Sequence, residues 1–289
     1  MAEAEIAVIG GSGLYDMEGL RDVETIRIAT PFGDPSDEVT IGDLSGRRVA
    51  FLPRHGRGHR ISPSELNQRA NIWALKSLGV QSVLSVSAVG SLRQELKPLD
   101  LVIPDQIVDR TRHRVDSFFT DGIVAHVGMA EPFCPDLRAR LYEHGRAAGS
   151  SIHDKGTLVV IEGPQFSTRA ESSLYRSWGM DIIGMTALPE ARLAREAELC
   201  YATIACVTDY DVWHVGAGDV TVDMVIQNLL RNTTVSREII RRVVPTIPDS
   251  PPCGCRSALR HAIMTAPARI PPLTRDRVDL LVGKYLPKA

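Results

Sequence analysis

LCYATIACVTDYDVW, at residues 199–213, is the stretch of this sequence that predicts a fold class. Its first nine residues, Leu199 to Val207, are apolar or small, which is typical of a strand buried on both faces inside a parallel sheet. The buried run is followed by two carboxylates, Asp209 and Asp211. Open α/β sheets bind ligands at the carboxyl ends of their strands, so we expect an α/β fold with a site here.

Asp209 and Asp211 are therefore the first candidates for chemistry. A carboxyl group against an apolar wall has a raised pKa and can hold a proton for a leaving group. Two acids separated by one residue also begin solvated loops, and the stretch taken alone leaves that alternative open. The rest of the chain decides between the two interpretations.

The composition predicts one α/β domain and excludes several classes of partner. The chain has 289 residues, of which 44% are hydrophobic, and a formal charge of −2. We expect a single domain over residues 1–289, with a proline-rich tail at 245–289 that lies over the body or a neighbouring subunit. The near-neutral charge predicts no nucleic-acid or membrane partner. An acidic N-terminus without a signal peptide, and no apolar run of ~20 residues, predict a cytoplasmic protein.

Five cysteines are too few and too scattered to predict a disulfide scaffold in a chain of this length. Cys200 and Cys206 are expected to be small core residues of the buried strand. Cys253 and Cys255 are candidates for a redox pair or for half of a metal site. For a metal site, however, the sequence offers no second cysteine pair with zinc-ligand spacing. We therefore predict no metal and favour free thiols or an intrachain disulfide, with the states of Cys134 and Cys200 left open.

Two glycine-rich loops are candidates for holding an anion. GGSG at residues 10–13 offers backbone N–H groups and the hydroxyl of Ser12, although a tight turn without a ligand is equally consistent with it. Its spacing matches neither the dinucleotide nor the P-loop motif. PRHGRGHR at residues 53–60 predicts a cationic phosphate pocket, for which a solvated basic loop is the alternative.

Strands and helices alternate along the rest of the chain. Besides the buried strand at residues 199–207, the predicted strands cover residues 6–9, a meander within 22–52, 82–86, 100–108, 155–161 and 181–186. The predicted helices cover residues 62–78, 138–148, 168–178, 190–198 and 222–243. Small or polar residues end several of the strands, which leaves room for a ligand against the backbone.

Seven motifs occur in order along the chain: GGSGLY, PRHGRGHR, SAVGSL, EPFCP, IEGPQFSTRAES, MTALPEA and TDYDVW. Together they resemble the methylthioadenosine phosphorylase branch of the purine nucleoside phosphorylases over residues 5–245. The resemblance implies a single α/β domain around a mixed, twisted sheet in the form of a distorted barrel, flanked by helices. It also implies a homotrimer or a dimer of trimers, with active sites near subunit interfaces.

The resemblance assigns roles to residues at the matching positions. The implied phosphate ligands are Ser12, Arg54, His55, Ser87, Ala88 and Thr186. The implied nucleoside contacts are Phe166, Ser167, Met185, Asp209, Asp211 and, around the 5′ end, His126, Val222, Val225 and Ile226. Asp209 and Asp211 are the implied catalytic residues, one protonating N7 of the purine and the other accepting from its 6-amino group. Ser12 and Ser87 stand where many members carry threonine, and either hydroxyl can serve.

The implied reaction is phosphorolysis of 5′-methylthioadenosine, in which phosphate is a co-substrate and no metal or organic cofactor takes part. Adenine nucleosides should be preferred, because a 6-oxo group would face a carboxylate acceptor to acceptor. The alternatives are a phosphorylase for methylthioinosine or other 6-oxopurine nucleosides, and a hydrolase that uses water. A catalytically silent nucleoside-binding protein is the alternative from outside the enzymes.

Overall fold

The strand predicted from residues 199–213 is present and buried along its whole length. The structure, a computed structural model, describes residues 3–11, 14, 17–214 and 221–287. β11 covers Cys200–Asp209, and all ten of its residues are buried. Alternate residues face opposite ways: Tyr201 and Val207 join one hydrophobic cluster, whereas Ala202 and Ile204 join another. Each face of this strand therefore needs its own layer of helices.

The elements alternate between strand and helix for most of the chain. The other strands are β1 Ile6–Gly10, β2 Arg21–Ile26, β3 Val39–Leu44, β4 Arg47–Pro53, β5 Ser82–Ser91, β6 Leu101–Val102, β7 Gln106–Arg110, β8 Ile152–His153, β9 Thr157–Ile161 and β10 Ile182–Gly184. The helices are α1 Gln68–Ser77, α2 Pro135–Ala147, α3 Arg169–Ser177, α4 Ala187–Glu196, α5 Val222–Val243 and α6 Pro272–Val282.

The strands of the described chain form one mixed sheet that branches at β5. Its main path runs β2-β3-β4-β1-β5-β10-β9-β7, while β11 pairs with β5 and continues to β6 and β8. The pairs of β5 with β1 and β11 are parallel, and its pair with β10 is antiparallel. The predicted mixed, twisted sheet is confirmed. Within the described residues its outer strands do not pair with each other, so the sheet is not closed into a barrel as the resemblance implied.

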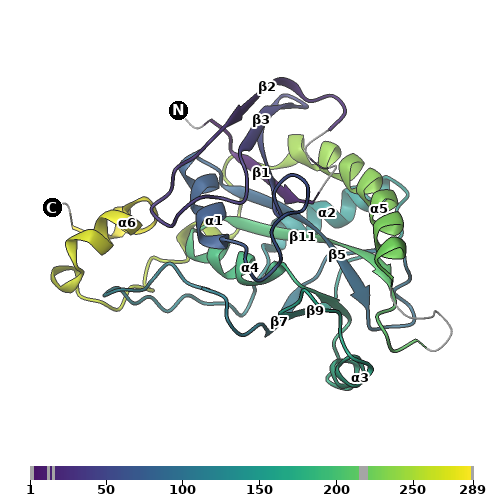
Figure 1. Ribbon diagram of the computed structural model, residues 1–289. Helices are drawn as coiled ribbons and strands as arrows, with labels where there is room; N and C mark the ends of the chain where they lie inside the picture. Colours follow the sequence, from purple (N-terminus) through teal and green to yellow (C-terminus); the bar gives the residue numbers. More distant parts are fainter. Residues whose placement is uncertain (1–2, 12–13, 15–16, 215–220, 288–289) are drawn as a thin grey trace.

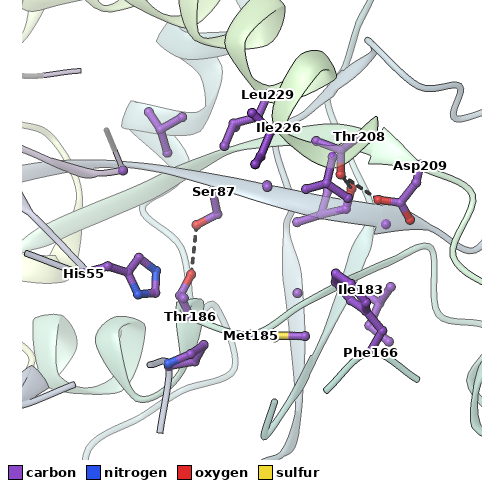
Figure 2. A pocket seen from close by; sticks show the side chains of 18 of the residues that line it. His55, Ser87, Phe166, Ile183, Met185, Thr186, Thr208, Asp209, Ile226 and Leu229 are labelled. Carbon is purple, nitrogen blue, oxygen red and sulfur yellow. Dashed lines mark hydrogen bonds between the residues drawn. The ribbon is translucent and has the colours of Figure 1, made fainter. Parts of the chain in front are cut away.

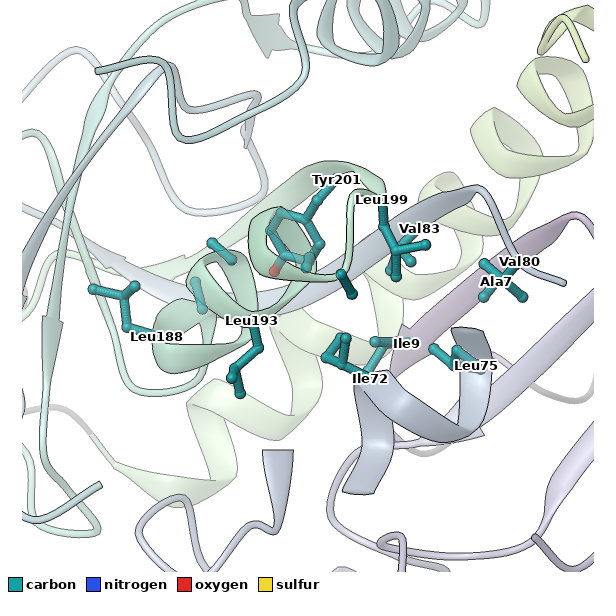
Figure 3. Packing of buried hydrophobic residues seen from close by; sticks show 14 of the residues in the cluster. Ala7, Ile9, Ile72, Leu75, Val80, Val83, Leu188, Leu193, Leu199 and Tyr201 are labelled. Carbon is teal, nitrogen blue, oxygen red and sulfur yellow. The ribbon is translucent and has the colours of Figure 1, made fainter. Parts of the chain in front are cut away.

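Helices cover both faces of the central strands (Figure 1). On one face, side chains of α1 and α4 such as Ile72 and Leu193 pack against Ile9 of β1 and Tyr201 of β11 (Figure 3). On the other face, α2 and α5 pack against the opposite side of the same strands. Each buried aliphatic or aromatic side chain contributes about 1.5–3 kcal/mol, so this double layer holds the carboxyl ends of β5 and β11 firmly.

The predicted helix at residues 62–78 begins later than its sequence signals indicate. Ser62 and Glu65 do bond each other, with Ser62 Oγ donating to Glu65 Oε2 over 2.6 Å, but they close a separate turn. α1 begins at Gln68, because the side chain of Asn67 accepts from the N–H of Ala70 and donates to the carbonyl of Phe32. A tertiary anchor therefore fixes the start of this helix.

One other prediction of secondary structure was wrong in detail. The strand predicted at residues 100–108 is divided into β6 and β7, which pair with different strands; Pro104, between them, has no N–H to continue a ladder. The proline-rich tail contains an α-helix, α6, whose first residue is Pro272, the position in a helix that tolerates proline best. Val278 and Leu281 of α6 join the core, so the tail lies against the body of the same chain. In the described part of the chain, no helix is both long and apolar enough to cross a membrane.

Candidate active site

A cavity of about 600 Å³ lies at the branch point of the sheet, under α5. β1 pairs with β5 only as far as Ser85, and β10 joins β5 only at Gly90, so residues 86–89 are left to line the cavity. Most of the predicted site residues line it: Arg54, His55, Ser87, Ala88, Phe166, Ser167, Met185, Thr186, Asp209, Asp211, Val222, Val225 and Ile226. Motifs that are far apart in the sequence thus converge on one space.

The cavity has a hydroxyl-lined end and an acidic end (Figure 2). At the first, His55 lies beside Ser87 and Thr186, whose hydroxyl oxygens are 3.1 Å apart. At the second, Asp209 faces a space bordered by Phe166 and Ile183. The arrangement suits a ligand with an anion at one end and a flat, polar-edged group at the other.

Asp209 is held by two hydrogen bonds and is almost excluded from water. Its side chain accepts from Thr208 Oγ1 at 2.7 Å and from the N–H of Asp211 at 2.8 Å. The residue is only 6% exposed. Burial raises the pKa of its carboxyl group above the ordinary value, and the two donors partly oppose that shift. Burial therefore favours the protonated form of this carboxyl group more than solvent would.

Asp211 lies in a strained backbone conformation with an unsatisfied oxygen. Its φ is +49°, which is uncommon for a residue other than glycine. Oδ2 is buried and makes no hydrogen bond to any described residue. Burial raises the pKa of this carboxyl to about 6, with Asp209 adding to the effect and the nearby Ser172 hydroxyl opposing it. Strain and an unpaired acceptor at one residue mark a position that a ligand donor can complete.

A bulge in β11 aims Asp209 into the cavity. The register with β5 shifts between Val207, opposite Val89, and Asp209, opposite Gly90. The carbonyls around the bulge are tied to α5: Asn228 donates to Thr208 O at 2.7 Å and Asn232 to Val207 O at 3.0 Å. Bulges re-aim side chains in this way next to active sites. Sequence patterns missed both asparagines, which sit on an otherwise ordinary amphipathic helix.

Arg54 and Glu190 form a fully buried ion pair behind the hydroxyl-lined end. Nε and Nη2 of Arg54 donate to the two carboxylate oxygens of Glu190 at 2.8 and 3.0 Å. Further donors reach Glu190 from Tyr201 at 2.7 Å and from Ser85 at 2.9 Å. Arg54 also donates from Nη1 to Val86 O, which is part of the cavity wall. Its guanidinium is therefore engaged within the protein, and its predicted contact with phosphate stays a prediction.

Glu190 was missed as a site residue because the sequence shows it only as the start of a helix. In the structure it occupies the first turn of α4 and is completely buried. The signal that could have revealed it is the charged residue inside the apolar motif MTALPEA.

His55 is a neutral donor–acceptor at the hydroxyl-lined end, not part of a cationic pocket. Burial and the neighbouring charge of Arg54 lower its pKa to about 4. Nδ1 lies 2.8 Å from the carbonyl oxygen of Ile61. Because a carbonyl only accepts, Nδ1 carries the proton and Nε2 is left with a lone pair for a ligand. The basic loop at residues 53–60 thus offers polar contacts to an anion more than net positive charge.

Two predicted residues are not placed at the cavity, one because the structure does not describe it and one because it lies elsewhere. Ser12 lies outside the described residues, although the neighbouring Gly11 and Leu14 are part of the wall. His126 is not among the lining residues; its N–H donates to the carbonyl of Ala262 in the C-terminal segment at 2.8 Å. The resemblance alone supports their roles.

α5 supplies an apolar border to the cavity. In a single copy of the chain, this border is partly exposed to solvent. Val222, Ile226 and Leu230 recur at helical spacing along the first half of α5, and all three line the cavity. Between 49% and 62% of each residue is exposed. An apolar ligand group or a second protein surface would cover them.

Comparison with known proteins agrees with this geometry. The model of the phosphorylase superfamily matches residues 5–245. The S-methyl-5′-thioadenosine phosphorylase of Geobacter sulfurreducens is 54% identical over 98% of this chain and 100% of its own length. That of Chloroflexus aurantiacus is 55% identical over 99% of both chains.

Solved structures extend the likeness to three dimensions. A methylthioadenosine phosphorylase from an antarctic soil metagenomic library has a TM-score of 0.93 at 50% identity, covering 97% of this chain and 99% of its own. The methylthioadenosine phosphorylase of Schistosoma mansoni in complex with adenine has a TM-score of 0.80 at 40% identity, covering 84% and 91%. The chain therefore belongs to the phosphorylase superfamily, within its branch of S-methyl-5′-thioadenosine phosphorylases.

Proposed function

We propose that the chain catalyses the phosphorolysis of S-methyl-5′-thioadenosine to adenine and 5-methylthioribose 1-phosphate. The observation that carries the proposal is the cavity itself, which joins a buried acidic pair to a hydroxyl-lined anion end. Relatives named for this activity match nearly the whole length of the chain. One of the solved relatives, a Schistosoma mansoni variant, is in complex with methylthioadenosine.

The hydroxyl-lined end would hold phosphate as the nucleophile. Ser87 and Thr186 can donate their hydroxyl protons, and Nε2 of His55 can accept from a protonated phosphate oxygen. Thr186 precedes α4, whose chain is extended at Leu188 and continues with Pro189, so the contribution of Thr186 here is its hydroxyl. Arg54 and Glu190 would act behind these residues by fixing the cavity wall.

The acidic end would bind and protonate the base. As a phosphate oxygen bonds to C1′, the C1′–N9 bond breaks and its electron pair moves into the purine. A proton held by Asp209 and Asp211 passes to N7, so adenine leaves as a neutral molecule. The unpaired Oδ2 of Asp211 is free to accept from the 6-amino group. The chemistry assigned to the cavity uses no group beyond these side chains and phosphate.

An assay over a panel of nucleosides that differ in the purine and in the 5′ group is the direct test of this function. Adenine release should depend on added phosphate, and kcat/KM for the 6-oxo analogue should be at least about 100-fold lower than for methylthioadenosine. Because the border from α5 is apolar, a methylthio group should be preferred over a 5′-hydroxyl by about 10- to 200-fold. Base release without phosphate would identify a hydrolase. Equal use of adenine and hypoxanthine nucleosides would refute the role of the acidic pair.

The acidic pair predicts the pH dependence of the reaction. The pKa of Asp211 is raised to about 6 and that of Asp209 is raised above its ordinary value, so the pair retains a proton at acidic pH and loses it as the pH rises through about 6. At saturating phosphate, kcat/KM for the nucleoside should therefore fall on the alkaline side of an apparent pKa of about 6. A rate that is flat from pH 5 to about pH 9 would exclude a protonated pair.

Gly90→Ala should impair catalysis by displacing Asp209. A Cβ at position 90 would lie 2.9 Å from Oδ1 of Asp209, closer than Cβ atoms normally approach another atom, and 3.0 Å from Cγ2 of Ile183, which is also a tight contact. A shift of about 1 Å in a catalytic group can reduce the rate 100-fold, and we expect a loss of kcat of about 10- to 100-fold. Gly128→Ala is the control, because that Cβ would meet nothing within 4 Å. Unchanged kcat in Gly90→Ala would mean that Asp209 need not occupy its observed position.

We also propose that the chain works as a homotrimer or a dimer of trimers in the cytoplasm, within purine and methionine salvage. The exposed apolar border of α5 supports association at the cavity mouth. In such an assembly, His126 would reach the 5′ end of a nucleoside bound to a neighbouring copy. Sedimentation of the purified chain measures the assembly directly.

A further inference from the structure

Four of the five cysteines, from three separate segments of the chain, converge at one place. Every pair of Sγ atoms among Cys134, Cys200, Cys253 and Cys255 lies within 4.8 Å, and Cys200 and Cys253 are 3.3 Å apart. All are free thiols, three are buried and Cys253 is partly exposed. The sequence predicted no second cysteine pair with zinc spacing, because only the fold brings residues 134 and 200 to the CGC motif.

The four positions are fixed by regular structure rather than by the thiols themselves. Cys134 is the N-cap of α2, and its N–H donates to the carbonyl of Tyr201 at 2.7 Å. Cys200 opens β11, and its N–H donates to Gln81 O at 2.9 Å. Cys255 lies in a short 3₁₀ turn, Gly254–Ser257, that Cys253 precedes. The site is thus built on backbone that other contacts hold in place.

We propose that these four cysteines bind one structural Zn²⁺ ion. Zinc is held by thiolates at about 2.3 Å, so the sulfurs of a tetrahedral site lie about 3.8 Å apart. The observed cluster lies close to that spacing and needs only small shifts of its side chains. Four soft sulfur ligands in tetrahedral array favour zinc over the hard cations that oxygen ligands select.

Zinc binding at this cluster requires no oxidant. The ion replaces the four thiol protons, which pass to solvent, and no sulfur changes its oxidation state. The bound group would carry a charge of −2, and Nη1 of Arg195 lies 3.5 Å from Sγ of Cys255 to offset it. Pairing the same thiols as two disulfides would instead require an external oxidant.

The role of the ion follows from its place in the fold. Four protein ligands leave no open coordination position, which is the pattern of structural rather than catalytic zinc. Cys200 is the first residue of β11 and Asp209 the last, so the ion lies at the opposite end of the strand from the acidic pair. It would clamp the tail at Cys253 and Cys255 onto β11 and α2. This inference does not depend on the proposed reaction.

The test begins with the metal content of the full-length protein, purified under reducing conditions after expression with added zinc. We expect one zinc per chain by mass spectrometry of the metal, and the absorption of a tetrahedral tetrathiolate after exchange for Co²⁺. Cys200→Ser and Cys255→Ser should each lose the ion. A chelator that strips the native protein should lower its Tm by roughly 10 °C.

Cys206→Ser is the matched control, because Cys206 is a buried thiol of the same strand that contacts Ser236 instead. It should keep its zinc. The inference is overturned if the native protein binds no stoichiometric zinc. This holds if the four thiols all react with an alkylating reagent, and equally if the mass of the protein is lower by four hydrogens because they form two disulfides. Another metal at full occupancy would overturn the zinc assignment.

Discussion

Asp209→Asn is expected to lower kcat by about 100- to 10,000-fold, the usual contribution of a general acid. Asparagine keeps the size of the side chain, and its single oxygen can still accept from the N–H of Asp211. Its NH2 group replaces the oxygen that accepts from Thr208, whose hydroxyl also lies within hydrogen-bond distance of Val89 O. Asparagine cannot release a proton to N7, so the purine would have to leave as an anion. Steady-state assays at saturating phosphate measure the effect.

The KM for phosphate is the internal control for Asp209→Asn. His55, Ser87 and Thr186 lie at the other end of the cavity, so this constant should change by less than about threefold. Turnover at the native rate would show that leaving-group protonation does not limit the reaction. A large change in the KM for phosphate would mean that the substitution disturbs the whole cavity.

Arg54→Ala and Glu190→Ala should each destabilise the protein by about 3–5 kcal/mol, because each leaves its partner as an unpaired buried charge. The side chains of Arg54 and Glu190 are 2% and 0% exposed. The surrounding donors from Tyr201 and Ser85 would also lose their acceptor when Glu190 is removed. Chemical denaturation with a structural probe gives the free energy of unfolding.

The double variant Arg54→Met and Glu190→Leu separates the structural role of the ion pair from its effect on phosphate. Removing both charges should restore most of the lost stability, since apolar replacements of buried pairs are often close to neutral. If Arg54 also positions the phosphate site, KM for phosphate should remain at least about tenfold raised in the stable double variant. A double variant with native kinetics would assign the pair to stability alone.

Local sequence signals predicted those parts of the fold that depend on few long-range contacts. The apolar run of β11 sufficed because a strand buried on both faces has no polar positions. The capping box of Thr168 and Glu171 opens α3 as expected, with both reciprocal hydrogen bonds present. α5 also has its predicted bounds. Each of these rests on residues within a single segment.

Features that depend on tertiary contacts were not readable from the sequence. The bulge before Asp209 exists because Asn228 and Asn232, on a different element, hold its carbonyls. Residues 53–60 looked cationic, yet burial neutralises His55 and Glu190 engages Arg54. The motifs therefore identified the lining of the cavity, whereas its charge state required the fold.

β5 changes its pairing partner between Ser85 and Gly90, and this change marks boundaries at which chimeras of related proteins can be joined. Up to Ser85, β5 pairs with β1; from Gly90 it pairs with β10. Residues 161–185, between β9 and α4, supply Phe166, Ser167 and Met185 from one continuous insert. Exchanging that segment between relatives should change the contacts that Phe166 and Met185 offer to a nucleoside, while the acidic pair, the α5 border and the hydroxyl-lined end stay native.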